Sequence, residues 1–186
     1  RCFSASKLFF SYGLGNSLYF PFRFGASTVL WPEKPDPEKI LQVIDKYKPT
    51  FFFSVPTLYA RFLRIEKKYD LSSLRICLSS GEPLPPAIFQ HWQERFGMEL
   101  LDVVGSTEAT HDFLANRPGR AKAGSSGEVT PAFEAKIVDE EAQQAGRLTQ
   151  RMKTLGFPAL LQVSAVGFAA LFPLPAVTPA PVVVAA

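Results

Sequence analysis

Cysteine, histidine and tryptophan are scarce in this chain, with two residues of each among 186. Cys77 lies in the mostly apolar stretch at residues 74–78, a position typical of a buried, reduced thiol. Two cysteines do not make the disulfide framework of a small secreted domain. We therefore expect a reducing, cytoplasmic setting.

The chain also lacks an excess of either charge. Its 20 basic and 17 acidic residues give a net charge of +3, and the two signs are interspersed along the sequence. Nucleic-acid-binding proteins gather Lys and Arg on one face or stripe, and no such stripe is present in the sequence. This pattern excludes nucleic acid as an expected partner.

No apolar run is long enough to predict a membrane span. Residues 154–186 contain no charged residue, and Arg147, Arg151 and Lys153 precede them, as in some membrane anchors. The longest stretch between prolines, residues 159–172, is shorter than the about 20 residues that a spanning helix needs. A disordered Ala/Pro-rich extension or a reading-frame artefact is therefore the stronger interpretation, and the sequence alone does not separate these two.

Apolar residues are plentiful, at 47% of the chain with 17 Phe, which excludes disorder for most of its length. A chain of 186 residues suits one domain, alone or with an appendage. The first residues include neither an initiator Met nor the layout of a signal peptide. We expect the chain to begin inside a longer protein.

Buried strands alternate with amphipathic helices over most of the sequence. This alternation predicts an α/β fold with an open, mostly parallel sheet flanked by helices and joined by right-handed crossovers. After about residue 141 the alternation stops, so we expect an irregular C-terminal tail. The expected strands cover residues 26–31, 50–55, 75–79, 100–104 and 135–139, and the expected helices cover residues 37–48, 58–65 and 86–96.

Polar loops follow three of these strands, at residues 54–57, 79–83 and 105–108. Ligands of parallel sheets bind beyond the carboxyl ends of the strands. We therefore expect the three loops to line one crevice. In the last loop, two hydroxyls and a carboxylate could hold phosphate oxygens and Mg²⁺, although such a turn alone is most often an ordinary strand exit.

Five motifs, taken together and in order, resemble the ANL superfamily of adenylate-forming enzymes. Residues 7–16 and 106–111 resemble its benzoate–CoA ligase branch in particular. The resemblance covers about residues 2–140, and it implies that residues 1–141 are part of an AMP-binding domain, the large N-terminal domain of such an enzyme, followed by an unmatched tail at residues 142–186. The motifs are Tyr-Gly-Leu-Gly-Asn at 12–16, Val-Pro-Thr at 55–57, Ser-Gly-Glu-Pro-Leu-Pro at 80–85, Gly-Ser-Thr-Glu at 105–108 and Gly-Ser-Ser-Gly-Glu-Val-Thr-Pro at 124–131.

The resemblance implies an aryl acid–CoA ligase, an acid–thiol ligase that forms an acyl-AMP from an aromatic carboxylic acid and ATP with Mg²⁺, and then transfers the acyl group to CoA. Thr107 and Glu108 are the implied catalytic residues, with Thr107 at the α-phosphate and Glu108 on the metal. The implied nucleotide-binding residues are Gly81, Glu82, Pro83, Asp102, Gly105, Ser106 and Thr107. The implied acid pocket is formed by Ser11, Tyr12, Ser80, Gly105, His111 and Asp112.

From the residues alone, Tyr12 could equally be a core aromatic, and His111 could be a solvated loop residue. The branch usually has apolar residues at the positions of Ser11 and Asp112. An Asp in the pocket wall would repel a carboxylate or demand a polar ring substituent, which favours an aryl acid in general over benzoate itself.

The family's upstream phosphate loop and the Lys of its C-terminal domain are not found among these residues. We therefore expect the isolated chain not to make acyl-AMP. The alternative from another class is a non-catalytic remnant that acts as a nucleotide-, small-ligand- or protein-binding module.

Overall fold

The computed structural model of the chain describes residues 1–107, 109–131, 133–138, 160–165 and 182–184. Its strands are β1 (Cys2–Ser4), β2 (Thr28–Leu30), β3 (Phe51–Ser54), β4 (Ile76–Ser79), β5 (Leu100–Gly105), β6 (Asp112–Ala115), β7 (Glu128–Val129), β8 (Phe133–Val138), β9 (Leu160–Ala165) and β10 (Val182–Val184).

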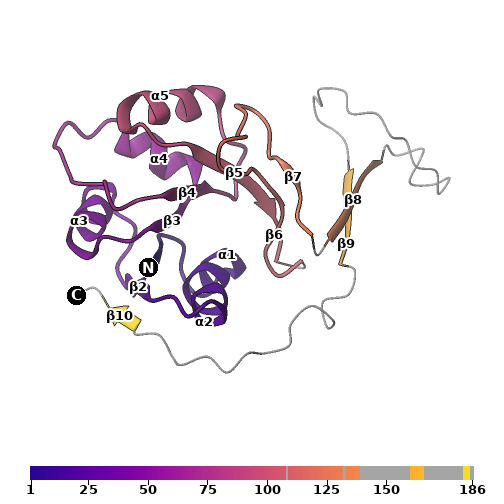
Figure 1. Cartoon of the computed structure of the whole chain (residues 1–186), viewed down its shortest axis with the longest axis horizontal. Helices are drawn as coiled ribbons and strands as arrows, with labels where there is room; N and C mark the ends of the chain where they lie inside the picture. The colour runs from indigo at the N-terminus through magenta and orange to yellow at the C-terminus, as the bar shows by residue number, and fades with distance from the viewer. Residues whose placement is uncertain (108, 132, 139–159, 166–181, 185–186) are drawn as a thin grey trace.

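One sheet contains the described strands in the order β10-β2-β1-β3-β4-β5-β6-β7 (Figure 1). Neighbours from β10 to β5 pair in parallel, whereas β6 and β7 are added antiparallel. β8 pairs only with β9, in a separate two-stranded sheet. The predicted open, mostly parallel sheet is thereby confirmed.

Helices cover the sheet in two groups. α3 (Pro37–Tyr47), α4 (Pro56–Phe62) and α5 (Pro86–Phe96) lie next to one another along the sheet (Figure 1). A second group runs without a break from α1 (Ser11–Leu14) through the π-helical turn η1 (Gly15–Tyr19) to α2 (Phe20–Arg23). η1 contacts β1 and β2, which brings this group to the carboxyl end of β1.

The ends of α3 and α5 follow from local sequence. Asp36 caps α3, because its Oδ1 accepts a hydrogen bond from the backbone N–H of Lys39 at 3.0 Å. α3 ends at Lys48, which adopts the left-handed conformation (φ 49°) directly before Pro49. α5 ends in the same way at Gly97 (φ 66°), where glycine avoids the steric cost of that conformation.

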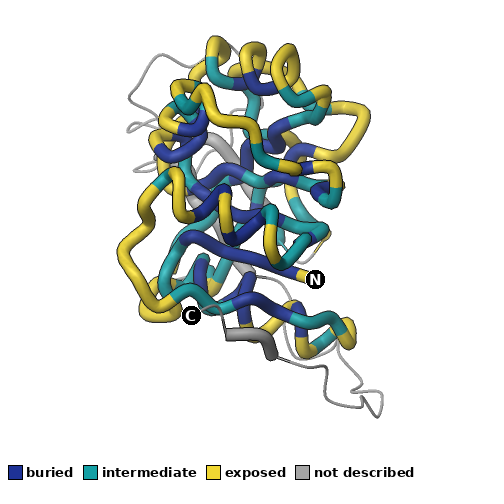
Figure 2. The backbone as a smooth tube through the Cα atoms, turned by 90° about the vertical axis from the view of Figure 1, so that its left-hand side faces the viewer, coloured by how far each residue is buried: buried dark blue, intermediate teal, exposed yellow. Residues whose placement is uncertain are grey.

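The main core lies between the sheet and the helices α3, α4 and α5. Trp92 of α5 and Tyr59 of α4 are 1% and 0% exposed, and their rings meet edge-on at 4.8 Å. Tyr59 also packs against Phe52 of β3, and its hydroxyl donates to the carbonyl of Leu78 at 2.9 Å. Figure 2 shows the burial of each residue along the backbone, with buried strands inside and exposed outer turns on the helices.

Two expectations need correction. α4 ends at Phe62, so the helix predicted through Ile65 is too long. After Phe62 the backbone continues in tighter bonds, with the N–H of Ile65 donating to the carbonyl of Phe62 at 3.1 Å, and the guanidinium of Arg95 also donates to the carbonyls of this turn.

The tail is also not irregular throughout, because β9 pairs with β8 and β10 pairs with β2. Its other residues lie outside the described part of the chain, and the predicted boundary at residue 141 stays a prediction. Among the described residues, no helix is both long and apolar enough to cross a membrane.

Candidate functional site

A pocket of about 310 Å³ opens at the carboxyl ends of the parallel strands. The three polar loops predicted to share a crevice all contribute to it, through Val55, through Ser80 and Gly81, and through residues 105–107. The structure adds the segment that follows β1. The lining residues are Ser6, Phe10, Ser11, Tyr12, Val55, Ser80, Gly81, Gly105, Ser106, Thr107, His111 and Asp112.

Sheet topology explains why the pocket forms at this place. The chain leaves β1 to form β2 on one side of it, and then returns to form β3 on the other side. Connections from the two strands therefore diverge at their carboxyl ends, which is where open parallel sheets bind ligands. Ser6 follows β1 and Val55 follows β3, so both residues lie at this switch point.

The structure brings together most, but not all, of the predicted site residues. Glu82 and Pro83 are exposed in the loop after Gly81 and are not among the lining residues, and Asp102 is buried in β5. Glu108, the predicted metal ligand, lies outside the described residues.

His111 is held on several sides. Its ring stacks on Tyr12 at 5.5 Å and meets the edge of Phe20 at 4.6 Å. Its Nδ1 lies 3.1 Å from Oδ2 of Asp112. Gly15 closes the remaining side, because a Cβ on this residue would lie 2.3 Å from Cδ2 of His111. The motif at residues 12–16 thus needs glycine at position 15 in order to seat the imidazole.

Tyr12 presents a buried hydroxyl beside this ring. Its Oη has no hydrogen-bond partner among the described residues, and its ring meets Phe53 edge-on at 6.3 Å. Burial, followed by the negative charges of Asp112 and Asp102, raises the pKa of Tyr12 well above its ordinary value. The phenol therefore stays protonated and can donate to a ligand.

Asp102 forms a second polar centre, next to the turn at residues 124–127. The hydroxyl of Ser126 donates to its Oδ2 at 3.0 Å, whereas its Oδ1 is buried without a partner among the described residues. Burial raises the pKa of Asp102 to about 6, against the lowering effect of the hydrogen bond from Ser126. The turn at residues 124–127 therefore holds this carboxylate through Ser126.

The loop after β5 is tied to the opposite wall. Oγ of Ser11 lies 3.4 Å from Oγ1 of Thr107, and the backbone N–H of Ala109 donates to Oγ of Ser106 at 3.2 Å. Thr110 has a φ of 71°, an unfavourable conformation for a β-branched residue. Such outliers persist where the surrounding contacts enforce them, often at functional sites.

The lining residues include no Lys or Arg, so the described pocket has no permanent positive charge to stabilise a phosphate. The described residues also contain no group of three or more His, Cys, Asp or Glu that could hold a metal ion alone. Mg²⁺ is commonly bound by one or two carboxylates together with substrate phosphates.

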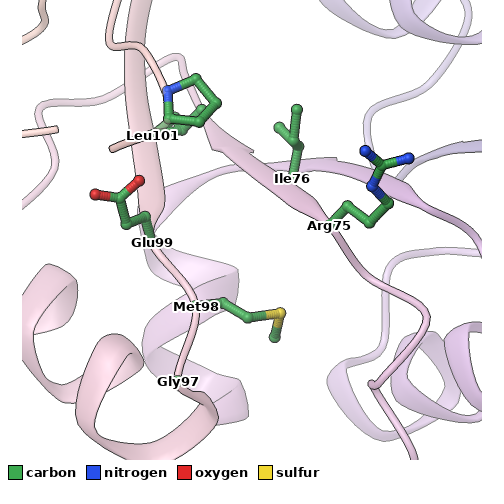
Figure 3. A pocket seen from close by; sticks show the side chains of 7 residues that line it. Arg75, Ile76, Gly97, Met98, Glu99 and Leu101 are labelled. Atoms are coloured by element: carbon green, nitrogen blue, oxygen red, sulfur yellow. The ribbon is translucent and has the colours of Figure 1, made fainter. Parts of the chain in front are cut away.

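Another pocket, of about 270 Å³, lies at the opposite ends of β4 and β5 (Figure 3). Its walls carry the apolar side chains of Ile76 and Met98, and its charged residues are Arg75 and Glu99. Glu99 already accepts a hydrogen bond from the backbone N–H of Gly119 at 2.6 Å. None of the predicted site residues belongs to this pocket, and we assign no chemistry to it.

Four contributors to the main pocket were not assigned from sequence: Ser6, Phe10, Val55 and the supporting Gly15. Val55 and Gly15 lie within the motifs at residues 55–57 and 12–16, so the sequence marked both positions. Their contacts in the pocket depend on residues that are distant in the sequence. Phe10 lies within residues 7–16, which resemble the benzoate–CoA ligase branch, whereas Ser6 lies outside every motif.

Comparisons with known proteins agree with this geometry. Residues 1–151 match the family model described as AMP-binding enzyme. The chain is 40% identical to a benzoate–CoA ligase of Thauera aromatica, over 91% of this chain and 31% of that protein. It is 44% identical to an anthranilate–CoA ligase of Pseudomonas aeruginosa, over 79% of this chain and 29% of that protein.

Solved structures give the same result. The fold is similar to that of a benzoate–CoA ligase from Burkholderia xenovorans, with a TM-score of 0.75 and 41% identity over 81% of this chain and 30% of that one. An anthranilate–CoA ligase in complex with anthranoyl-AMP has a TM-score of 0.73 and 43% identity, over 75% of this chain and 28% of that one. This chain thus spans less than a third of the length of these relatives. It belongs to the AMP-binding enzyme family, and its predicted resemblance to the benzoate–CoA ligase branch of the adenylate-forming enzymes is confirmed.

Proposed function

We propose that this chain is the nucleotide- and acid-binding part of an aryl acid–CoA ligase. Such an enzyme joins an aromatic carboxylic acid to AMP at the expense of ATP, and then passes the acyl group to the thiol of CoA. The observation that carries the proposal is the pocket at the switch point, where three loops of one family's motifs converge. The 40% and 44% identities to benzoate– and anthranilate–CoA ligases favour an aromatic acid.

In this proposal the pocket residues have separate tasks. Thr107 holds the α-phosphate with its hydroxyl and the loop N–H groups, while Glu108 ligates the Mg²⁺ that offsets phosphate charge. Gly81, Glu82 and Pro83 border the adenine, and Asp102 faces its amino group. The acid lies among Ser11, Tyr12, Ser80, His111 and Asp112, next to Gly105 and Ser106 of the nucleotide loop.

The chain's own side chains can bind and orient these groups, but the lining of the pocket contains no Lys or Arg that could stabilise the charge developed during phosphoryl chemistry. We therefore expect the chain alone to bind AMP and aryl-AMP analogues without forming acyl-AMP. The alternative, a remnant that binds only other proteins, predicts no nucleotide binding at all.

A thermal-shift titration separates the two functions. A ligand at 100 times its Kd stabilises a protein by about 2.7 kcal/mol, which corresponds to a rise in Tm of about 5 to 10 °C for a chain of this size. We expect this rise with AMP and a larger one with an aroyl-sulfamoyl adenosine, an unreactive aryl-AMP analogue. Thr107→Val should weaken both, and Glu94→Gln on the outer surface of α5 should change neither.

No shift with either ligand would remove the nucleotide-binding function. Exchange of pyrophosphate into ATP in the presence of benzoate, well above that of Glu108→Ala, would show instead that the chain is catalytically active. Transfer of the acyl group to CoA is to be measured with the complete enzyme.

A further inference from the structure

The wall of the pocket contains a carboxylate that is almost fully enclosed. The side chain of Asp112, at the start of β6, is 11% exposed. Its Oδ1 accepts a hydrogen bond from the hydroxyl of Ser80 at 3.2 Å, and its Oδ2 lies 3.1 Å from Nδ1 of His111. A carboxylate offers about four acceptor positions, so the hydrogen bond from Ser80 leaves further acceptor capacity at this wall.

The neighbours of Asp112 leave it little room to move. A Cβ on Gly105 would lie 2.7 Å from Oδ1 of Asp112, so β5 passes directly against the carboxylate. His111 is itself seated between Tyr12, Phe20 and Gly15. The position of the carboxylate is therefore set by the fold, as a specificity-determining group requires.

Two further polar atoms of the same wall are unsatisfied. Oη of Tyr12 and Nε2 of His111 are buried without hydrogen-bond partners among the described residues. The carboxylate of Asp112 thus supplies acceptors at this wall, whereas the hydroxyl of Tyr12 supplies a donor.

We propose that Asp112 makes this pocket select aromatic acids whose ring carries a hydrogen-bond donor, an amino or hydroxyl group; this rests on the proposed function of the same site. An unsubstituted ring would exclude water from the carboxylate without offering it a donor, which is costly for a buried charge. A ring N–H or O–H supplies that donor. The acid's own carboxylate is repelled by Asp112 and lies toward Ser11 and Thr107.

The test uses the 186-residue chain and a set of aroyl-sulfamoyl adenosines measured by isothermal titration. Their rings are unsubstituted or carry one methyl, hydroxyl or amino group at the ortho, meta or para position. Methyl has nearly the size of the other two groups but donates no hydrogen bond. We expect hydroxyl or amino to bind about 10- to 100-fold more tightly than methyl at one ring position, the range for a hydrogen bond to a charged group.

Variants assign the preference to Asp112. Asp112→Leu, of similar size, should abolish it or reverse it in favour of methyl. Asp112→Asn keeps an acceptor oxygen without the charge and should give an intermediate ratio. Glu94→Gln removes a carboxylate from α5, which contributes no residue to this pocket, and should retain the full preference. Binding of AMP confirms that each variant is folded. If Asp112→Leu does not bind AMP, the preference measured for Asp112→Asn decides the result.

Each outcome has a distinct meaning. Equal affinity for methyl and for the donor-bearing rings would overturn the selection while leaving aryl-adenylate binding in place. A preference that survives in Asp112→Leu would overturn its assignment to this residue. Failure of the chain to bind any analogue, or AMP, would overturn the proposed function and the selection together.

Discussion

Asp102 is a carboxylate that the fold buries within β5, and its protonation is coupled to stability. Its pKa is raised from an ordinary value of 3.8 to about 6, so the folded state favours the protonated form. The stabilisation from this group is therefore complete below about pH 4 and is lost as the pH rises through about 6. Asp102→Asn, neutral at every pH, should remove this dependence and gain about 1 to 2 kcal/mol relative to the wild type at pH 8.

Urea unfolding at intervals between pH 4 and pH 8 measures this effect, with Glu94→Gln as a control that should follow the wild-type curve. Parallel curves for Asp102→Asn and the wild type would contradict the assignment of the pH dependence to Asp102. The comparison of slopes matters more than absolute stability, because the Asn amide cannot accept all the hydrogen bonds that the carboxylate accepts.

For single residues, the sequence predicted which side chains would be chemically distinctive but not all of their contacts. Ser11, Tyr12, His111 and Asp112 were assigned to one pocket by resemblance, and they do line one. The need for glycine at position 15 was not predicted, because it arises from the ring of His111, which reaches it from a distant loop. The roles of these residues in binding stay predictions.

Among the helices, α3 has ends that are set by residues close to it in the sequence. The contribution of its N-terminal cap to stability is simple to test. Asp36 caps its N-terminus through the hydrogen bond from the N–H of Lys39. Asp36→Ala should lower the free energy of unfolding by about 1 kcal/mol, whereas Asp36→Asn, which keeps an acceptor oxygen, should lower it by much less. Urea unfolding at neutral pH measures both, and equal losses in the two variants would indicate that the cap bond contributes nothing.

α3 and α5 were predicted closely because their limits lie in the sequence itself, in an N-terminal proline and a left-handed residue at the C-terminus. α4 was predicted too long, because the chain after Phe62 forms a tighter turn whose carbonyls also accept from Arg95, 30 to 33 positions away. The short strands β1, β6 and β7 were not predicted either.

The molecule as a whole has exposed aromatic side chains gathered in residues 8–24. Phe9 is 80% exposed and Phe24 is 74% exposed, with Phe10, Tyr19, Phe20 and Phe22 also open to solvent. Apolar surface of this kind promotes association. We expect the weight-average mass of the chain in sedimentation equilibrium to rise with concentration. The double variant Phe9→Lys, Phe24→Lys should weaken the association by about tenfold or more, given about 1.5 kcal/mol or more for each aromatic side chain withdrawn from water.

Val129→Lys introduces one positive charge, half of the charge added by the double variant, at an apolar residue that is 36% exposed on β7, outside this segment, and should leave the association unchanged. A monomer over the whole concentration range would contradict the expectation. Equal effects of the control and the double variant would point to net charge, and not to the aromatic segment, as the cause.

Local sequence determined the α/β alternation, the limits of α3 and α5, and the chemical identity of the three loops, because these depend on periodicity and capping over a few residues. Tertiary structure alone decided that Ser11 and Thr107, 96 positions apart, lie within 3.4 Å, and that His111 is enclosed between α1, η1 and β6. Such contacts depend on the order of strands across the sheet. That order is settled by the packing of the whole domain, and no local spacing encodes it.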